Sequence, residues 1–181
     1  MTITRRQLLR NGLALGAAVP AALSTGMVGQ AMAAGLSLNG EIRLFGSDRS
    51  TAELGRGLQE KGWKPVDAGR FDPLALTALP SGSLAAGFTD EAGLALLTSQ
   101  LVGRGRILVQ GRHGSGNHQL VSQRGPVAEP LMSGAGSWQA ALGREYARLA
   151  ENLPTARHVR NLRDPSGMPS NTSELSFLVR V

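Results

Sequence analysis

The chain has 181 residues, with 19 lysine and arginine residues against 13 aspartate and glutamate residues and a formal net charge of +6. It contains no cysteine, which excludes thiolate-ligated iron–sulfur clusters, covalent c-type haem, cysteine nucleophiles and cysteine-based zinc sites. An electron carrier is therefore not expected, and we predict no cofactor.

The N-terminus carries two adjacent arginines, two leucines and a further basic residue, at Arg5, Arg6, Leu8, Leu9 and Arg10. A mildly apolar run over residues 11–29 follows, too rich in alanine and glycine for a strong membrane span of about 20 apolar residues. Planar guanidinium groups form paired hydrogen bonds that lysine cannot reproduce, so adjacent arginines carry more information than positive charge alone. The segment resembles a bacterial twin-arginine export signal.

A small-x-small cleavage site is present at Ala31 and Ala33, which predicts a signal peptide over residues 1–33 and an exported domain over 34–181. The alternatives are an ordinary secretion signal and an uncleaved anchor. The resemblance implies that the domain folds first, passes through the twin-arginine export machinery and becomes periplasmic or secreted, without a stable membrane anchor after cleavage. Export in the folded state is also compatible with a co-exported protein partner.

Signal removal takes away three arginines and no acidic residue, which leaves 16 basic against 13 acidic residues and a net charge of +3. This charge is too small to attract nucleic acid over long range, so no nucleic-acid partner is predicted. The remaining 148 residues fit one domain, which buries about 68–70% of its unfolded surface and needs no disulfide.

The first half of the exported domain is predicted to alternate strands and helices. We expect strands at residues 36–45, 64–68 and 84–88, a helix at 50–61, a turn of helix at 74–79, and a second full helix that ends before Gly103. Ser50 with Glu53 has the spacing of a capping box, and Thr89 is the expected cap of the second helix.

The second half is richer in strands. Strands are expected at residues 106–110, 118–123, 157–162 and 174–181, with a hairpin loop at 113–117 and a further loop at 164–173. The amphipathic helix expected over residues 138–152 is capped by Ser137. We predict an α/β fold in which one domain has a mixed sheet packed by about three helices, with a strand-rich C-terminal half.

A glycine-rich segment follows the strand at 106–110. Gly111 and Gly116 have the spacing of a phosphate-binding loop, but Asn117 and His118 stand where that loop needs lysine and serine or threonine. A strand is predicted next, so the anion site of a helix N-terminus is also missing. The sequence argues against nucleotide binding.

His113 and His118 could contribute to a metal or acid–base site, because imidazole binds metals and titrates near neutral pH. A metal site would need His158 and scattered acidic residues to complete it, and the spacing does not bring these together, so no metal is predicted. The alternative, which we favour, is a solvent-exposed hairpin with polar tips.

The densest basic segment of the exported domain contains Arg157, His158, Arg160 and Arg163. A second group surrounds the hairpin, at Arg104, Arg106, Arg112 and Arg124. If the groups share a sheet edge, they could bind a carboxylate or phosphate through paired contacts. The alternative, which we favour, is ordinary solvation of surface arginines. The candidate ligand-binding residues are Arg112, His113, His118, Arg157, His158 and Arg160.

The sequence has no G-x-S-x-G and no S-x-x-K motif, and a catalytic serine finds no support from spacing. The leading hypothesis is an exported, non-catalytic binding or accessory domain. The alternative is a small metal-assisted or hydrolytic enzyme that uses His113 and His118. Capture of an anionic ligand by the arginines is a third hypothesis.

Overall fold

The computed structural model describes residues 40–46, 48–114, 117–127, 137–163 and 174–181. The predicted export signal, the beginning of the first predicted strand and the loop predicted at 164–173 lie outside these residues. No helix in the described part of the chain is both long and apolar enough to cross a bilayer.

Seven strands and four helices occur in the described residues, and each overlaps an element expected from the sequence. In chain order they are β1 (Glu41–Phe45), α3 (Arg49–Glu60), β2 (Lys64–Asp67), α4 (Pro73–Thr77), β3 (Leu84–Thr89), α5 (Glu91–Leu101), β4 (Arg106–Gly114), β5 (Asn117–Ser122), α6 (Trp138–Glu151), β6 (His158–Arg163) and β7 (Glu174–Arg180). The helix beyond the predicted three is α4, expected only as a turn.

All seven strands form one sheet in the order β2-β1-β3-β7-β4-β5-β6. Strands β2, β1 and β3 are parallel, and the pairings from β3 through β7, β4 and β5 to β6 are antiparallel. The predicted α/β domain with a mixed sheet is therefore confirmed. The carboxyl ends of β1, β3 and β4 lie at the same end of the sheet as the amino ends of β5 and β7.

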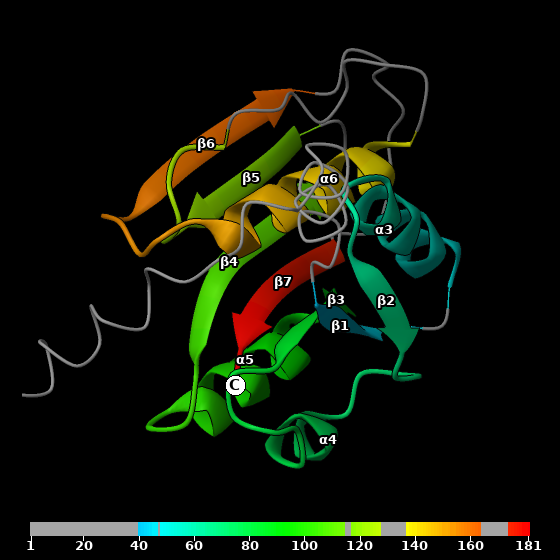
Figure 1. Ribbon diagram of the computed structural model, residues 1–181. Coiled ribbons are helices and arrows are strands. Elements are labelled where there is room, and N and C mark those ends of the chain that lie inside the picture. The colour runs from blue at the N-terminus through cyan, green and yellow to red at the C-terminus, as the bar shows by residue number, and fades with distance from the viewer. Residues whose placement is uncertain (1–39, 47, 115–116, 128–136, 164–173) are drawn as a thin grey trace, which may run out of the picture. The chain divides into compact units, whose positions relative to one another are not determined.

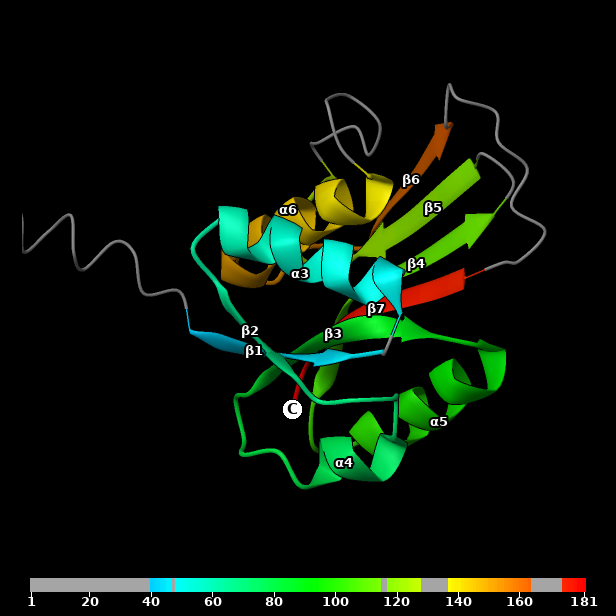
Figure 2. The ribbon, with the colours of Figure 1, turned by 90° about the vertical axis from the view of Figure 1, so that its right-hand side faces the viewer.

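Helices cover the two faces of the sheet unequally. Helices α3 and α6 lie together on one face, and α4 and α5 lie on the other, as Figures 1 and 2 show. Strands β5 and β6 have α6 on one side only, and Gln119, Val159 and Asn161 on their other side are exposed. The part of the sheet formed by β5 and β6 therefore has one open face.

Aspartates cap three of the four described helices, and at α3 and α5 they replace the caps predicted from the sequence. The side chain of Asp48 accepts the backbone N–H of Thr51 at 3.0 Å, so the cap of α3 is not the predicted Ser50. The side chain of Asp90 caps α5 in the same way, in place of the predicted Thr89. A carboxylate satisfies a free backbone N–H and also interacts with the positive end of the helix dipole.

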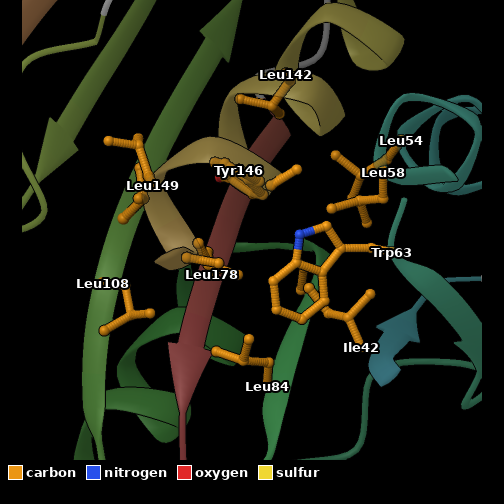
Figure 3. Close-up of a cluster of buried hydrophobic side chains, with 14 of the residues drawn as sticks. Ile42, Leu54, Leu58, Trp63, Leu84, Leu108, Leu142, Tyr146, Leu149 and Leu178 are labelled. Carbon is orange, nitrogen blue, oxygen red and sulfur yellow. The ribbon is translucent and has the colours of Figure 1, made fainter. Parts of the chain in front are cut away.

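The larger core fills the space between the sheet and the helices α3 and α6 (Figure 3). Its fully buried side chains include Ile42, Leu54, Leu58, Leu108, Leu142, Tyr146, Leu149 and Leu178. A smaller core under α4 and α5 contains Phe45, Leu76, Leu97, Phe177 and Val179. Tyr146 is the largest of the fully buried side chains, and its hydroxyl must find a hydrogen-bond partner inside the protein.

Helices α3 and α6 touch through glycine. A Cβ atom on Gly57 would lie 1.9 Å from the carbonyl oxygen of Ala140, and one on Gly143 would lie 2.2 Å from the carbonyl oxygen of Leu54. Both neighbours are backbone atoms, which cannot move without shifting a helix. Because Gly57 and Gly143 have no side chain, α6 can approach α3 closely. This distance also determines how α6 lies over the sheet.

We expect Gly143→Ala to destabilise the protein by about 1–3 kcal/mol, because overpacking outweighs the gain of about 1 kcal/mol in helix propensity. Gly55→Ala is the matched control, since its Cβ would meet only side-chain atoms, the nearest being Leu44 Cδ1 at 2.8 Å. Urea unfolding measures both variants. Equal stabilities for the two would contradict the close backbone contact.

Candidate functional site

Polar side chains from three neighbouring strands form a row at one end of the sheet. Glu174 on β7 lies opposite His113 on β4, and His113 lies opposite His118 on β5. Paired residues of antiparallel strands point to the same face, here the face that α6 covers. The two histidines predicted as candidates are thus brought together.

The two histidines are buried, and the prediction of a solvent-exposed hairpin is wrong. His113 is 2% exposed and His118 is 4% exposed. Strand β4 continues to Gly114 and β5 begins at Asn117, so the histidines belong to the strands and not to the loop. Alternation along these strands turns both side chains toward α6.

The imidazole rings meet edge to edge beneath an aromatic side chain. Nδ1 of His113 lies 2.9 Å from Nδ1 of His118. The ring of Trp138, the first residue of α6, lies over both, with centroid separations of 4.5 Å to His113 and 4.8 Å to His118. Phe88 completes the apolar surroundings with an edge contact to His113 at 6.3 Å.

The hydrogen bonds continue from the histidines into the core. Nε2 of His113 lies 2.6 Å from Oγ of Ser176 on β7, and the hydroxyl of Tyr146 on α6 lies 2.7 Å from the same Oγ. We call Tyr146, Ser176, His113 and His118 the histidine chain. It joins α6 to three strands through groups that are all buried.

Gly111 leaves the room that the histidine chain needs. It lies opposite Ser176 in the β4–β7 pairing. A Cβ at Gly111 would lie 2.2 Å from Ser176 Oγ and 2.5 Å from His113 Nε2. A glycine inside a strand here marks a close approach of side chains rather than the end of the strand.

Burial fixes the protonation of His113 and Tyr146. Desolvation, helped by the neighbouring His118, lowers the pKa of His113 to about 3, so the ring is neutral near pH 7. Burial raises the pKa of Tyr146, which keeps its proton. The only hydrogen-bond partner of that hydroxyl in the described residues is Ser176 Oγ, so the phenol donates there rather than leave its proton unpaired.

With Tyr146 as the donor to Ser176, the donors and acceptors of the other hydrogen bonds follow when both imidazole rings are neutral. Ser176 accepts from Tyr146 and donates to Nε2 of His113. The single proton of His113 is then on Nδ1 and is donated to Nδ1 of His118, which carries its own proton on Nε2. Every internal hydrogen bond of the chain is satisfied in this arrangement.

Ser176 and His113 have the separation of a nucleophile and its base, and His118 holds the far nitrogen of His113 as the third member of a triad would. Access is missing, however. Ser176 is 0% exposed, and Tyr146, also 0% exposed, contacts its oxygen. A substrate could not reach Ser176 Oγ in this structure, so the arrangement acts as a hydrogen-bonded support for the sheet end.

An open groove of about 680 Å³ lies beside the buried pair, at the hairpin end of β4, β5 and β6. We call it the hairpin groove. Its described lining is Arg112, His113, Gly114, Asn117, His118, Gln119, Asn161 and Leu162. Most of these side chains can donate or accept hydrogen bonds, and they come from both faces of the sheet.

The exposed polar side chains of the groove are weakly held. Nε2 of Gln119 donates to Oδ1 of Asn161 at 3.0 Å in an exposed contact. Arg112, whose side chain is 61% exposed, pairs with Glu91 at 3.2 Å. Exposed pairs of this kind contribute about 0–1 kcal/mol, so a ligand can take over their hydrogen bonds at little cost.

No protein-family model, curated protein or solved structure matches this chain. The chemistry of the hairpin groove therefore has to be inferred from its own side chains. Its position at the carboxyl ends of β4 and β6 does not by itself define an activity.

The remaining predicted candidates do not join the groove. His158 lies opposite Ser122, at the far end of β5 from His118. The guanidinium of Arg160 donates to the carbonyl of Val127 at 2.5 Å, and Arg157 is exposed. Three members of the predicted basic segment therefore lie away from the two central histidines, whereas Arg163 lies opposite Asn117 at the hairpin end of the sheet.

A metal site does not form among the described residues, where no group of three or more His, Asp or Glu side chains converges. Two imidazoles alone do not supply the three protein ligands of a typical catalytic zinc site. The neighbouring carboxyl group of Glu174 is half-buried, and burial and then the nearby Asp48 raise its pKa. A carboxyl group binds a metal in its ionised form, so the raised pKa makes Glu174 a poorer metal ligand.

Sequence reasoning did not foresee that Ser176 and the hydroxyl of Tyr146 hydrogen-bond to the histidines' site, or that Gly111 leaves space for it. One signal was present: Ser176 interrupts the apolar run from Leu175 to Val179, and a polar residue at a buried position needs a partner. The partner itself could not be inferred, because it lies 63 residues away.

We expect the stability of the protein to fall as pH drops below about 6.5. In the unfolded chain His113 becomes protonated in this range, whereas in the folded protein burial keeps the ring neutral down to a pKa of about 3. This residue contributes about 2 kcal/mol of the loss between about pH 7 and pH 5. His113→Asn should lose that part of the pH dependence in urea unfolding.

His158→Asn is the control, because it removes a histidine at the far end of β5 from His118 and leaves His113 in place. Glu174, whose pKa is raised above its ordinary value of 4.5, changes the stability in the opposite direction, because the folded chain then binds its proton more readily than the unfolded chain. The same pH dependence in His113→Asn and His158→Asn would contradict the assigned state of His113.

Proposed function

We propose that this protein is an exported, non-catalytic domain that binds a small polar ligand in the hairpin groove. The observation that carries the proposal is an open groove lined by hydrogen-bonding side chains and backed by two histidines that the core holds rigidly. A volume of about 680 Å³ lies within the range of roughly 300–1,000 Å³ that small-molecule sites occupy.

The lining favours a ligand with both donors and acceptors. Asn117, Gln119 and Asn161 each offer a carbonyl oxygen and an amide nitrogen. Arg112 adds one positive charge, already paired with Glu91, so the site has no strong preference for a highly charged molecule. Leu162 supplies an apolar contact. Sugars and short polar peptides have this chemistry.

The rigidity of the back wall supports binding rather than catalysis. A side chain fixed by packing and hydrogen bonds presents its polar atoms without losing further entropy when a ligand arrives. His118 is held by Nδ1 of His113 and by the ring of Trp138. A hydrolase would need Ser176 as its nucleophile, but this side chain is buried and in contact with Tyr146.

A second candidate function is supported by the distances in the histidine chain. Ser176, His113 and His118 have the separations of a nucleophile, a base and an orienting group. A hydrolase of this kind would require α6 to move so that Tyr146 uncovers Ser176. The buried state of both residues makes this the weaker of the two candidates.

Amide chemical shifts of the exported domain, recorded against a panel of mono- and disaccharides, amino acids and di- and tripeptides, test the binding proposal. We expect saturable shifts at Asn117, Gln119 and Asn161 for one class. Gln119→Ala and Asn161→Ala should each weaken that binding about tenfold, the effect of losing a hydrogen bond of roughly 1.4 kcal/mol. Gln100→Ala on α5 is the matched control.

Two outcomes would count against binding without catalysis. The first is shifts confined to residues away from the groove. The second is covalent labelling of Ser176 by a fluorophosphonate probe, which would mean that the serine is reachable and activated and would favour the hydrolase.

We also propose that the twin-arginine machinery delivers the folded domain to the periplasm or the outside of the cell, where cleavage after Ala33 releases it. The support is the residue pattern at Arg5, Arg6, Leu8 and Leu9. A thiol-free domain with two packed cores needs no disulfide formed after export, so it can complete its folding in the cytoplasm.

Replacing Arg5 and Arg6 together by lysine should hold the protein in the cytoplasm, because lysine keeps the charge but loses the paired hydrogen bonds of guanidinium. Cell fractionation and the size of the processed chain measure this. Arg10→Lys is the control and should be exported normally. Normal export of the double variant would contradict the twin-arginine route.

A further inference from the structure

Three arginines meet at the end of the sheet opposite the hairpin groove. Arg106 at the start of β4 lies directly opposite Arg180 at the end of β7. Arg124 follows β5 at the same end. Two of the three guanidinium groups donate to carbonyl oxygens at the end of α6, Arg124 to Asn152 at 2.7 Å and Arg180 to Ala150 at 3.3 Å, and these bonds fix them in one place.

The three guanidinium groups have no aspartate or glutamate carboxylate paired with them in the described residues. None of the ion pairs of that part of the chain includes Arg106, Arg124 or Arg180. Arg124 is only 5% exposed. The Nε atoms of Arg124 and Arg180 are buried and have no described acceptor.

This arrangement is electrostatically unfavourable for the protein alone. Like charges directly opposite each other on antiparallel strands are destabilising. Burial, and then the charges of Arg180 and Arg106, lower the pKa of Arg124. The carboxyl end of α6 offsets about half an elementary charge, so the three guanidinium groups keep a positive surplus.

We propose that Arg106, Arg124 and Arg180 bind a small dianionic oxyanion of the phosphate type at the carboxyl end of α6. A dianion neutralises the remaining charge more completely than a monoanion such as acetate. Guanidinium forks match the oxygens of a phosphate group. Arg106 is exposed and provides the approach from solvent, while Arg124 and Arg180 form the buried part of the site.

The site is separate from the hairpin groove. The arginines lie where β4 begins and β5 ends, and the groove lies where β4 ends and β5 begins. Failure of ligand binding at the groove would therefore leave this proposal unaffected, and the two can be tested on the same sample.

Inorganic phosphate is the probe for the first experiment. Thermal unfolding and calorimetric titration are carried out in phosphate, in acetate and in chloride at equal ionic strength. We expect saturable binding of phosphate with a rise in melting temperature, and a clearly smaller rise in acetate. Tighter binding of glycerol 3-phosphate than of phosphate would assign the site to a phosphate monoester.

Arg106→Gln separates the proposal from a purely structural role of the arginines. The variant should weaken phosphate binding about tenfold or more, the loss of a charge-assisted hydrogen bond. Without phosphate it should melt at a higher temperature than the wild type, because one like charge opposite Arg180 is gone. Arg70→Gln, an exposed arginine at the other end of the sheet, is the control of equal charge.

Three results would overturn the proposal: no saturable phosphate binding, an equal response to phosphate in Arg106→Gln and the wild type, or a lower melting temperature of Arg106→Gln in the absence of phosphate. Each would mean that the helix carbonyls alone satisfy the three guanidinium groups.

Discussion

The hydrogen-bonded chain from Tyr146 through Ser176 and His113 to His118 is the constraint on which the hairpin end of the sheet depends. It joins α6 to β7, β4 and β5 by contacts of 2.6–2.9 Å, and the two glycines at the crossing of α3 and α6 bring α6 close enough to take part. Buried polar groups are costly when one partner is missing. The chain therefore specifies a single position of α6, and through it the shape of the hairpin groove.

The two ends of the sheet have different chemistry for a reason that lies in α6. At its amino end, Trp138 covers two hydrogen-bonded imidazoles, of which His113 is neutral near pH 7, and the neighbouring groove is lined mainly by uncharged polar groups. At its carboxyl end, carbonyl oxygens attract guanidinium groups, and the positive charge that gathers there exceeds what the helix can offset. One helix thus organises a neutral site and a cationic site about one helix length apart.

Sequence reasoning found the order of helices and strands and two of the four residues in the histidine chain. Periodicity and capping residues act over a few positions, so they locate elements well, and errors were confined to boundaries such as Asp48 replacing Ser50 as a cap. The exposure of the histidines was predicted wrongly because Gly111 and Gly114 are typical of a loop. In the structure Gly111 is part of β4, since only glycine leaves space for Ser176 and His113.

By itself, the sequence determined that the protein has no thiol chemistry, that its domain alternates helices and strands before ending in strands, and that its first residues carry the pattern of an export signal. The tertiary structure decided which distant side chains meet. Strand register placed Ser176 beside His113 and Arg106 beside Arg180, and helix packing brought Tyr146 onto that serine. These contacts depend on register and crossing geometry, which arise only when the whole sheet is assembled, and for that reason no local pattern could reveal them.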